Sequence, residues 1–198
     1  MQTHGQANHV DGSERLAERA LLDAAGLAAA LDRLAAGIAR DFGAAPDLCL
    51  VGIKRRGDVL ARRLQALLAA RLGRALPLGS LDITLYRDDF DSLSEELTVG
   101  ATQIPFALDR RTVVLVDDVL FTGRTVRAAL DELLDLGRPA RIVLAVLIDR
   151  GWRELPIAPD LAAVTPETAR DDDVQVALVE TDGRDAVTLR RARDGGRG

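Results

Sequence analysis

The sequence predicts an α/β fold in which a mainly parallel, doubly wound sheet is flanked by helices. Nearly continuous apolar runs at Leu48–Ile53, Thr112–Val116 and Arg141–Ile148 are typical of strands buried on both faces. Stretches with apolar residues at helical spacing separate these runs. Because strands and helices alternate, right-handed crossovers should bring the carboxyl ends of the strands to one edge, where such sheets bind ligands.

Length and composition fit one domain with short tails. The chain has 198 residues and is 47% hydrophobic, enough to bury a core without disulfides. We expect a flexible tail over residues 1–14, one domain over 15–190 and a basic tail over 191–198. The single cysteine, Cys49, is expected to be a small buried hydrophobe.

Several classes of protein are disfavoured. No apolar run approaches the ~18 residues of a membrane span, and the polar N-terminus lacks a secretory signal, so a cytoplasmic protein is expected. A net charge of −5 argues against a general nucleic-acid binder but allows a local basic face. His4 and His9 have no cysteine or acidic cluster around them, which disfavours a metal site there.

The N-terminal half predicts helices on either side of the first central strand. A short helical piece is expected over Leu16–Leu22 and a firmer helix over Leu27–Asp41. The strand Leu48–Ile53 ends in Lys54-Arg55-Arg56-Gly57, and Asp58 is expected to cap the next helix. The three cations suit an anionic ligand, although a solvated basic turn would give the same pattern.

The stretch from Val113 to Thr125 organises the chain. Four apolar residues lead to Asp117 and Asp118, and the turn Thr122-Gly123-Arg124-Thr125 precedes a helix expected to bury Val126, Ala129, Leu130, Leu133 and Leu134. A glycine turn at a helix start offers free N–H groups to a phosphate, and adjacent carboxylates can accept hydrogen bonds from vicinal hydroxyls. The unit therefore suits a ribose 5-phosphate.

An ordinary crossover with a solvated acidic pair would give the same spacing. The turn has neither the Gly-Lys-Ser/Thr of a P-loop nor the Gly-x-Gly-x-x-Gly of a dinucleotide site.

The remaining segments predict a further strand, a long loop and a closing hairpin. A strand is expected over Leu81–Tyr86, and the charged loop 87–103 contains a possible β-ribbon over Glu96–Ala101. Strands over Val174–Val179 and Ala186–Leu189 should flank a hairpin turn at Asp182-Gly183.

These motifs resemble those of type I phosphoribosyltransferases, and within them the PyrR family. The stretch Val113–Thr125 is similar to the motif that binds phosphoribosyl pyrophosphate (PRPP). The narrower match, over about residues 26 to 190, rests on four further stretches: Leu50–Gly57, Leu81–Asp89, Gly137-Arg-Pro139 and Leu144–Ile157.

The resemblance implies a uracil phosphoribosyltransferase that also regulates pyrimidine genes by UMP-dependent mRNA binding and transcription attenuation. It implies a loop from Arg87 that closes over the substrates and a hood over about residues 150–180. The implied catalytic residues are Lys54, Arg87, Asp117 and Asp118. The implied PRPP and nucleotide contacts are Lys54, Arg56, Gly57, Arg87, Asp117, Asp118, Val119, Leu120, Phe121, Thr122, Gly123, Arg124, Thr125 and Arg150.

The same resemblance implies Mg²⁺ bound with PRPP, near Asp117 and Asp118. The implied partners are PRPP, uracil, UMP, an mRNA leader and further copies of this chain in a homodimer or higher oligomer. Uracil recognition would use backbone groups near Val146–Ile148 and Arg150. Trp152 replaces the histidine that PyrR proteins usually have, and it could either stack on a base or pack.

Two departures from the family pattern leave a second hypothesis open. Residues 161–173 lack the usual lysine and asparagine, and Asp32 and Ala36 replace a threonine and a histidine that face RNA. A carboxylate opposes phosphate binding. The chain is therefore either an active enzyme, with or without RNA regulation, or a nucleotide-sensing RNA-binding regulator with little or no turnover.

Overall fold

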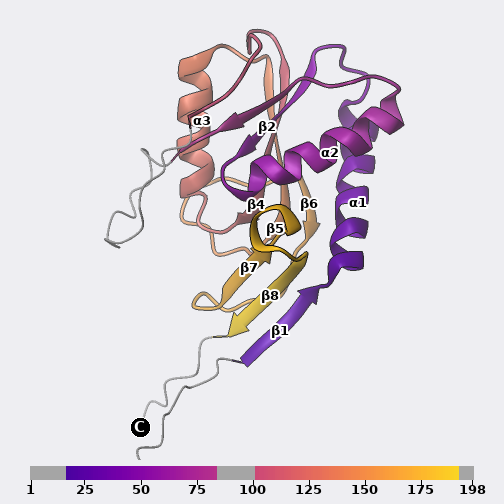
Figure 1. Ribbon diagram of the computed structural model, residues 1–198. Coiled ribbons are helices and arrows are strands. Elements are labelled where there is room, and N and C mark those ends of the chain that lie inside the picture. The colour runs from indigo at the N-terminus through magenta and orange to yellow at the C-terminus, as the bar shows by residue number, and fades with distance from the viewer. Residues whose placement is uncertain (1–16, 84–100, 192–198) are drawn as a thin grey trace, which may run out of the picture.

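A computed structural model describes residues 17–83 and 101–191 of the chain. Its larger sheet has five parallel strands in the order β3-β2-β4-β5-β6 (Figure 1). The strands are β2 Leu48–Ile53, β3 Leu78–Leu81, β4 Thr112–Leu120, β5 Arg141–Asp149 and β6 Leu161–Val164. This arrangement confirms the predicted fold class.

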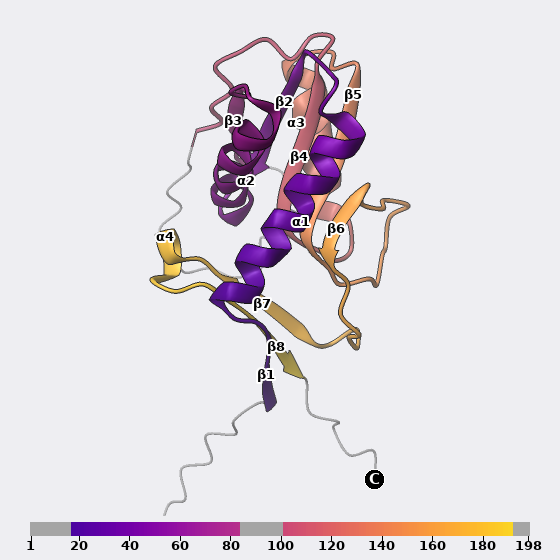
Figure 2. The ribbon, with the colours of Figure 1, turned by 90° about the vertical axis from the view of Figure 1, so that its right-hand side faces the viewer.

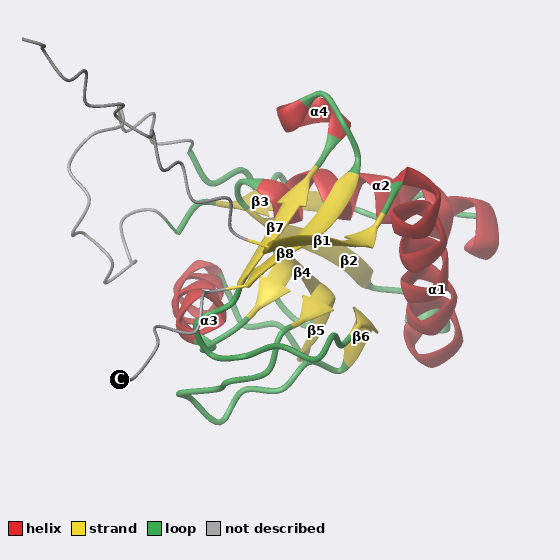
Figure 3. Ribbon diagram, turned by 90° about the horizontal axis from the view of Figure 1, so that it is seen from below, coloured by secondary structure: helices red, strands yellow, loops and turns green. Residues whose placement is uncertain are grey.

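Helices cover both faces of the larger sheet (Figure 3). The helices α1 Ala24–Phe42 and α2 Arg56–Leu72 pack with alternate strand residues such as Val114 and Val116. On the other face, α3 Arg124–Leu136 packs with Val113 and Leu115. The four residues Val113–Val116 therefore alternate between two hydrophobic clusters, one on each face of the sheet, which explains why this part of β4 is apolar without interruption. Cys49 is fully buried, as expected.

Two glycines let the start of α2 approach the sheet closely. A Cβ on Gly52 would lie 2.3 Å from Asp58 Cα, and a Cβ on Gly57 would lie 2.4 Å from the Val116 carbonyl oxygen. Real Cβ atoms do not come this close to backbone, so both positions require glycine. The first turn of α2 is thereby held against β2 and β4.

A smaller antiparallel sheet lies at one end of the molecule (Figure 2). Its order is β1-β8-β7, with β1 Ala17–Leu22, β8 Ala186–Arg191 and β7 Asp173–Ala177. The segment predicted as a short helix is therefore β1, and that prediction was wrong. It pairs with β8 from the far end of the chain, a long-range contact that outweighs local helix propensity.

Other boundaries differ from the sequence predictions. The strand predicted to start at Leu81 is β3, which begins three residues earlier and ends at Leu81. After it, the Asp82 N–H donates to Thr102 Oγ1 instead of to a neighbouring strand. Residues 84–86 of the predicted strand and the predicted ribbon over 96–100 lie outside the described residues. Asp58 does not cap α2, because α2 begins two residues before it and the Asp58 carboxylate accepts the Val59 N–H, inside the helix.

The closing hairpin is also more elaborate than predicted. The one-turn helix α4, Val179–Asp182, lies between β7 and β8, and Gly183 ends it with φ +72°. The expected hood divides between the two sheets, since β6 extends the larger sheet and β7 belongs to the smaller one. Leu134, expected to be buried, is 57% exposed because it lies on the outer side of α3.

Within the described residues, no helix is long and apolar enough to cross a membrane.

Candidate active site

The parallel pairing of β2 with β4 brings the basic turn beside the acidic pair. Gly52 pairs with Val116, so Lys54–Gly57 and Asp117-Asp118 follow at the same edge of the sheet. The contact between Gly57 and Val116 fixes this arrangement from the side of α2. Gly57 therefore acts as a spacer between helix and strand.

The acidic pair lies within β4, whereas the sequence predicted it just after the strand. Asp117 is 4% exposed, and its Oδ1 accepts the Asp118 N–H at 2.9 Å. Asp118 Oδ1 accepts the Val119 N–H at 2.9 Å. The strand continues because Val119 and Leu120 still pair with Ile148 and Asp149 of β5.

Burial raises the pKa of Asp118 above its ordinary value, because water that would solvate the carboxylate is excluded. The positive charge of Arg56 and the Val119 N–H oppose this effect. Further positive charge or further hydrogen-bond donors near Asp118 would therefore stabilise its charged form.

The cationic side chains of the basic turn have different hydrogen-bond partners. Lys54 Nζ donates to the Ala101 carbonyl oxygen at 2.8 Å, and the Lys54–Arg55 peptide bond is cis. Arg56 Nη2 donates to Asp182 Oδ1 of α4 at 3.1 Å. The basic turn therefore contacts two segments that are distant in sequence.

The start of α3 is open to an anion. Its N-cap residue, Gly123, has φ +93° and no side chain with which to cap the helix. Thr122 Oγ1 accepts the Arg124 N–H at 3.3 Å, while the first-turn N–H groups of Thr125 and Val126 have no partner in the helix itself. Such a helix start attracts phosphate through its N–H groups and its dipole.

The segment after β5 supports this turn from behind. Glu154 and Leu155 donate their N–H groups to the Thr122 carbonyl oxygen at 3.0 and 3.2 Å. Arg153 donates to the carbonyl oxygens of Leu120, Phe121, Gly151 and Ile157 and to the Asp149 carboxylate. The role of Arg153 was missed in the sequence, because its partners are mostly backbone oxygens that leave no side-chain pattern.

Glu154 links the turn to a later part of the hood segment through two ion pairs. The Glu154 carboxylate accepts from Arg124 at 2.9 Å and from Arg170 at 2.7 Å. These contacts keep the pKa of Glu154 below its ordinary value, chiefly through the hydrogen bond from Arg124.

The chain matches known proteins over most of its length. Residues 18–182 match the phosphoribosyl transferase domain family. The bifunctional protein PyrR of Syntrophobacter fumaroxidans is 48% identical over 174 residues, which cover 88% of this chain and 94% of that protein. The bifunctional protein PyrR of a Roseiflexus species is 52% identical over 168 residues, which cover 85% and 92%.

The chain belongs to the PyrR family of phosphoribosyltransferases.

Solved structures agree with the fold. The hypoxanthine phosphoribosyltransferase of Trypanosoma cruzi superposes with a TM-score of 0.67 at 18% identity, covering 89% of this chain and 98% of that one. A purine phosphoribosyltransferase from Pyrococcus horikoshii is 27% identical, with a TM-score of 0.52 and coverage of 73% and 84%.

Two residues of the expected hood contact neighbouring segments in this PyrR-family chain. Arg150 is 9% exposed, its guanidinium lies 3.8 Å from the centre of the Phe121 ring, and it donates to the Arg170 carbonyl oxygen. Trp152 is 44% exposed with φ 59°, and its Nε1 donates to the Thr168 carbonyl oxygen at 3.0 Å. Arg150 thus packs against Phe121, the residue before the turn Thr122–Thr125.

Other residues named from the sequence are placed less directly. Arg87 lies outside the described residues. Val119 and Leu120 are β4 residues that pack into the two hydrophobic clusters. Asp32, which departs from the family pattern, forms an ion pair with Arg71 of α2.

The donor set fits a magnesium ion only in part. Asp117 and Asp118 offer hard carboxylate oxygens, as Mg²⁺ prefers. Across the two described ranges, no group of three or more His, Cys, Asp or Glu side chains could hold a metal. A magnesium ion here would need most of its ligands from substrate oxygens and water.

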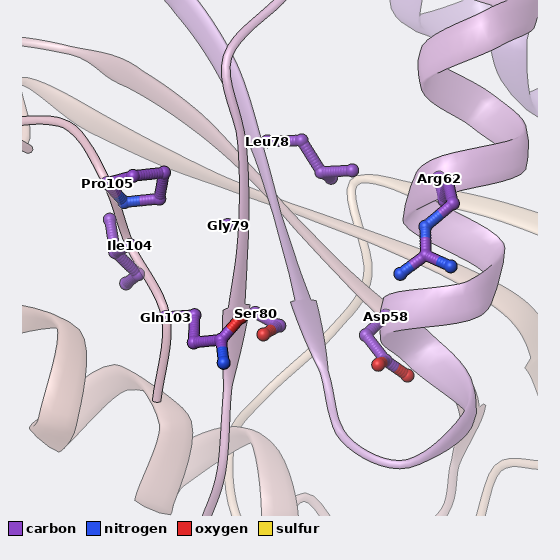
Figure 4. A pocket seen from close by; sticks show the side chains of 8 residues that line it. All are labelled: Asp58, Arg62, Leu78, Gly79, Ser80, Gln103, Ile104 and Pro105. Carbon is purple, nitrogen blue, oxygen red and sulfur yellow. The ribbon is translucent and has the colours of Figure 1, made fainter. Parts of the chain in front are cut away.

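A separate cavity of ≈ 460 Å³ lies between α2 and β3 (Figure 4). Asp58 and Arg62 line it from α2, and Ser80 and Gln103 line it from the other side. The cavity and the site both lie next to α2, but none of the residues that line the cavity belongs to the site described above.

Proposed function

We propose that this PyrR-family protein converts uracil and PRPP into UMP and pyrophosphate. We also propose that it regulates pyrimidine biosynthesis genes through UMP-dependent binding to an mRNA leader. The observation that carries the catalytic part is the meeting of three features at one edge of the sheet. They are the acidic pair in β4, the basic turn after β2 and the uncapped start of α3.

Catalysis in this proposal is mainly electrostatic and positional. Lys54 and Arg56, together with Arg87, stabilise the negative charge of the departing pyrophosphate. Asp117 and Asp118 accept hydrogen bonds from the 2′- and 3′-hydroxyls and lie near the positive charge that develops on the ribose ring. Backbone N–H groups of Thr122–Thr125 hold the 5′-phosphate, and the hydrogen bonds from Glu154 and Leu155 keep that turn in place.

Mg²⁺ bound with PRPP supplies charge neutralisation at the leaving group. Asp117 and Asp118 would hold it indirectly, through the ribose oxygens or water. Because the two carboxylates are too few to hold Mg²⁺ by themselves, they favour an ion that arrives with the substrate and not one that is bound beforehand.

Uracil recognition would use backbone groups near Val146–Ile148, at the end of β5, and near Arg150. Arg150 would act there through its main chain and its support of Phe121, because its guanidinium is buried.

The second candidate is a nucleotide-sensing RNA-binding regulator with little or no turnover. The altered residues 161–173 favour it, because a nucleotide can bind where catalysis is slow. Asp32 bears on RNA in both cases: its pairing with Arg71 reduces the repulsion that a bare carboxylate would exert on phosphate. The proposed assembly is a homodimer or higher homo-oligomer, and an mRNA partner implies action in the cytoplasm.

Pyrophosphate release from PRPP and Mg²⁺, with and without uracil, tests the proposal. Uracil-dependent release by the wild type, reduced by about 100-fold or more in Asp118→Asn, is the expected result. Binding of UMP or PRPP without any turnover would refute the catalytic part and favour the regulator.

A further inference from the structure

Arg56 of the basic turn depends on a residue from the far end of the chain. Among the described residues, Asp182 of α4 is the one hydrogen-bond partner of the Arg56 guanidinium, at 3.1 Å. Arg56 Nε is buried without a partner. Nothing else that is described therefore fixes the direction in which this guanidinium points.

Asp182 is itself held firmly. Its Oδ2 accepts the Leu178 N–H at 2.9 Å and the Thr181 hydroxyl at 2.6 Å, which leaves Oδ1 for Arg56. These bonds, with Arg56, lower the pKa of Asp182 to about 2, so the carboxylate is charged at neutral pH. Arg63 of α2 anchors the same connection through Glu180 and Asp185.

Arg56 also lies beside the acidic pair, because a Cβ on the next residue, Gly57, would be 3.2 Å from Asp117 Cα. Asp118 is only partly exposed, and its carboxylate attracts a cation that is free to move towards it. A guanidinium released from Asp182 would turn towards Asp118 and neutralise it. Both groups would then be less available to an incoming ligand.

We propose that Asp182 is a positioning residue for the pyrophosphate group of PRPP. It holds Arg56 beside Asp118 without letting the two form an ion pair, so that Arg56 stays available to pyrophosphate and Asp118 to ribose. The inference rests on the proposed function. It adds α4 to the elements that shape the site, with Asp182 acting through Arg56.

The test compares Asp182→Asn with Asp185→Asn, in the full-length chain. Asp185 lies in the same connection and forms a similar ion pair, but with Arg63, so its loss controls for weakened attachment of α4. We expect Asp182→Asn to raise KM for PRPP and the Kd for magnesium pyrophosphate about tenfold, which is about 1.4 kcal/mol. The value of kcat should change less than about threefold. Asp185→Asn should leave both constants within about twofold of the wild type.

Equal constants for the two variants, or tighter binding by Asp182→Asn, would overturn the proposal. A second readout does not depend on activity. It is the NMR signal of the buried Arg56 Nε–H, which is assigned by its disappearance in Arg56→Lys. Its protection from solvent exchange should persist in Asp185→Asn and be lost in Asp182→Asn. Persistence in both would contradict the positioning role, whereas a wild type that binds neither PRPP nor pyrophosphate would refute the proposed function separately.

Discussion

At the scale of single residues, two glycines of the site serve different needs. Gly57 allows the start of α2 to touch the Val116 carbonyl, whereas Gly123 adopts a left-handed backbone and faces Leu155 and Ile157. The sequence motif marks both positions but does not separate a packing requirement from a conformational one.

Gly57→Ala is expected to destabilise the protein by about 1–3 kcal/mol, because backbone must move to admit the methyl group. It should also weaken PRPP binding, since the displaced strand carries the acidic pair. Urea unfolding and calorimetric titration with PRPP would measure both effects.

Gly73→Ala is the matched control. Gly73 caps α2 with φ +66° and has open space around it. The alanine there should cost about 1–2 kcal/mol of strain and leave PRPP binding unchanged. Normal PRPP binding by Gly57→Ala would contradict the coupling between helix and strand.

Two aspartates near Arg56 should give opposite pH dependences of stability. The pKa of Asp118 is raised by burial, so the folded state holds its proton more tightly and stability falls as pH rises above about 3.8. The pKa of Asp182 is lowered to about 2, so its contribution is present above about 3.8 and is lost as pH falls towards 2.

Asp118→Asn should therefore raise the Tm at pH 7 relative to the wild type, with a smaller gain at pH 4. Asp182→Asn should lower the Tm at pH 7, and its difference from the wild type should shrink towards pH 2. Calorimetry across this range checks both signs. A loss of stability in Asp118→Asn that is larger at pH 7 than at pH 4 would contradict the assigned cause.

At the scale of elements, Arg153 fastens the segment after β5 to the end of β4. Arg153→Ala removes its hydrogen bonds to backbone oxygens and Asp149, so we expect a loss of about 2–4 kcal/mol in the free energy of unfolding. The turn Thr122–Thr125 should loosen as well, raising KM for PRPP.

Arg127→Ala is the control for Arg153. Arg127 is exposed on α3 and forms an ion pair with Asp131, one turn further along the helix. Such a pair contributes about 0.3–0.5 kcal/mol. If Arg153→Ala were no more destabilising than Arg127→Ala, the supporting role of Arg153 would be wrong.

Elements were predictable where a local pattern decides their structure. The strands β2, β4 and β5 are apolar runs buried on both faces, and the burial of α1 follows its spacing of leucines. The strand β1 was not predictable, because its partner β8 lies at the other end of the chain. In the site, the acidic pair and basic turn carry motifs, but the contact between Asp182 and Arg56 is long-range and leaves no spacing in the sequence.

At the scale of the whole molecule, the smaller sheet is attached to α2 by a cluster of charges. Arg63 forms ion pairs with Glu180 and Asp185, and Arg56 with Asp182. The hydrogen bonds that Arg63 donates to Glu180 and Asp185 raise the pKa of Arg63 further, so its charge is permanent.

Arg63→Ala should cost about 1–3 kcal/mol, because the pairs are only partly exposed. Hydrogen exchange should become faster in β7 and β8 but not in β4. Arg40→Ala, which removes an exposed pair with Asp41, should change neither stability nor exchange measurably. Uniformly faster exchange in all strands would contradict a local attachment.

The pairing of β1 with β8 joins Ala17 to Arg191, so the two ends of the described chain are neighbours (Figure 1). During synthesis on a ribosome, the first strand must wait for the last one to emerge before the smaller sheet can close. Asp182 reaches Arg56 from the connection that precedes this last strand. A nascent chain can therefore complete its larger sheet before α4 is made, and Arg56 gains its partner Asp182 only after that point.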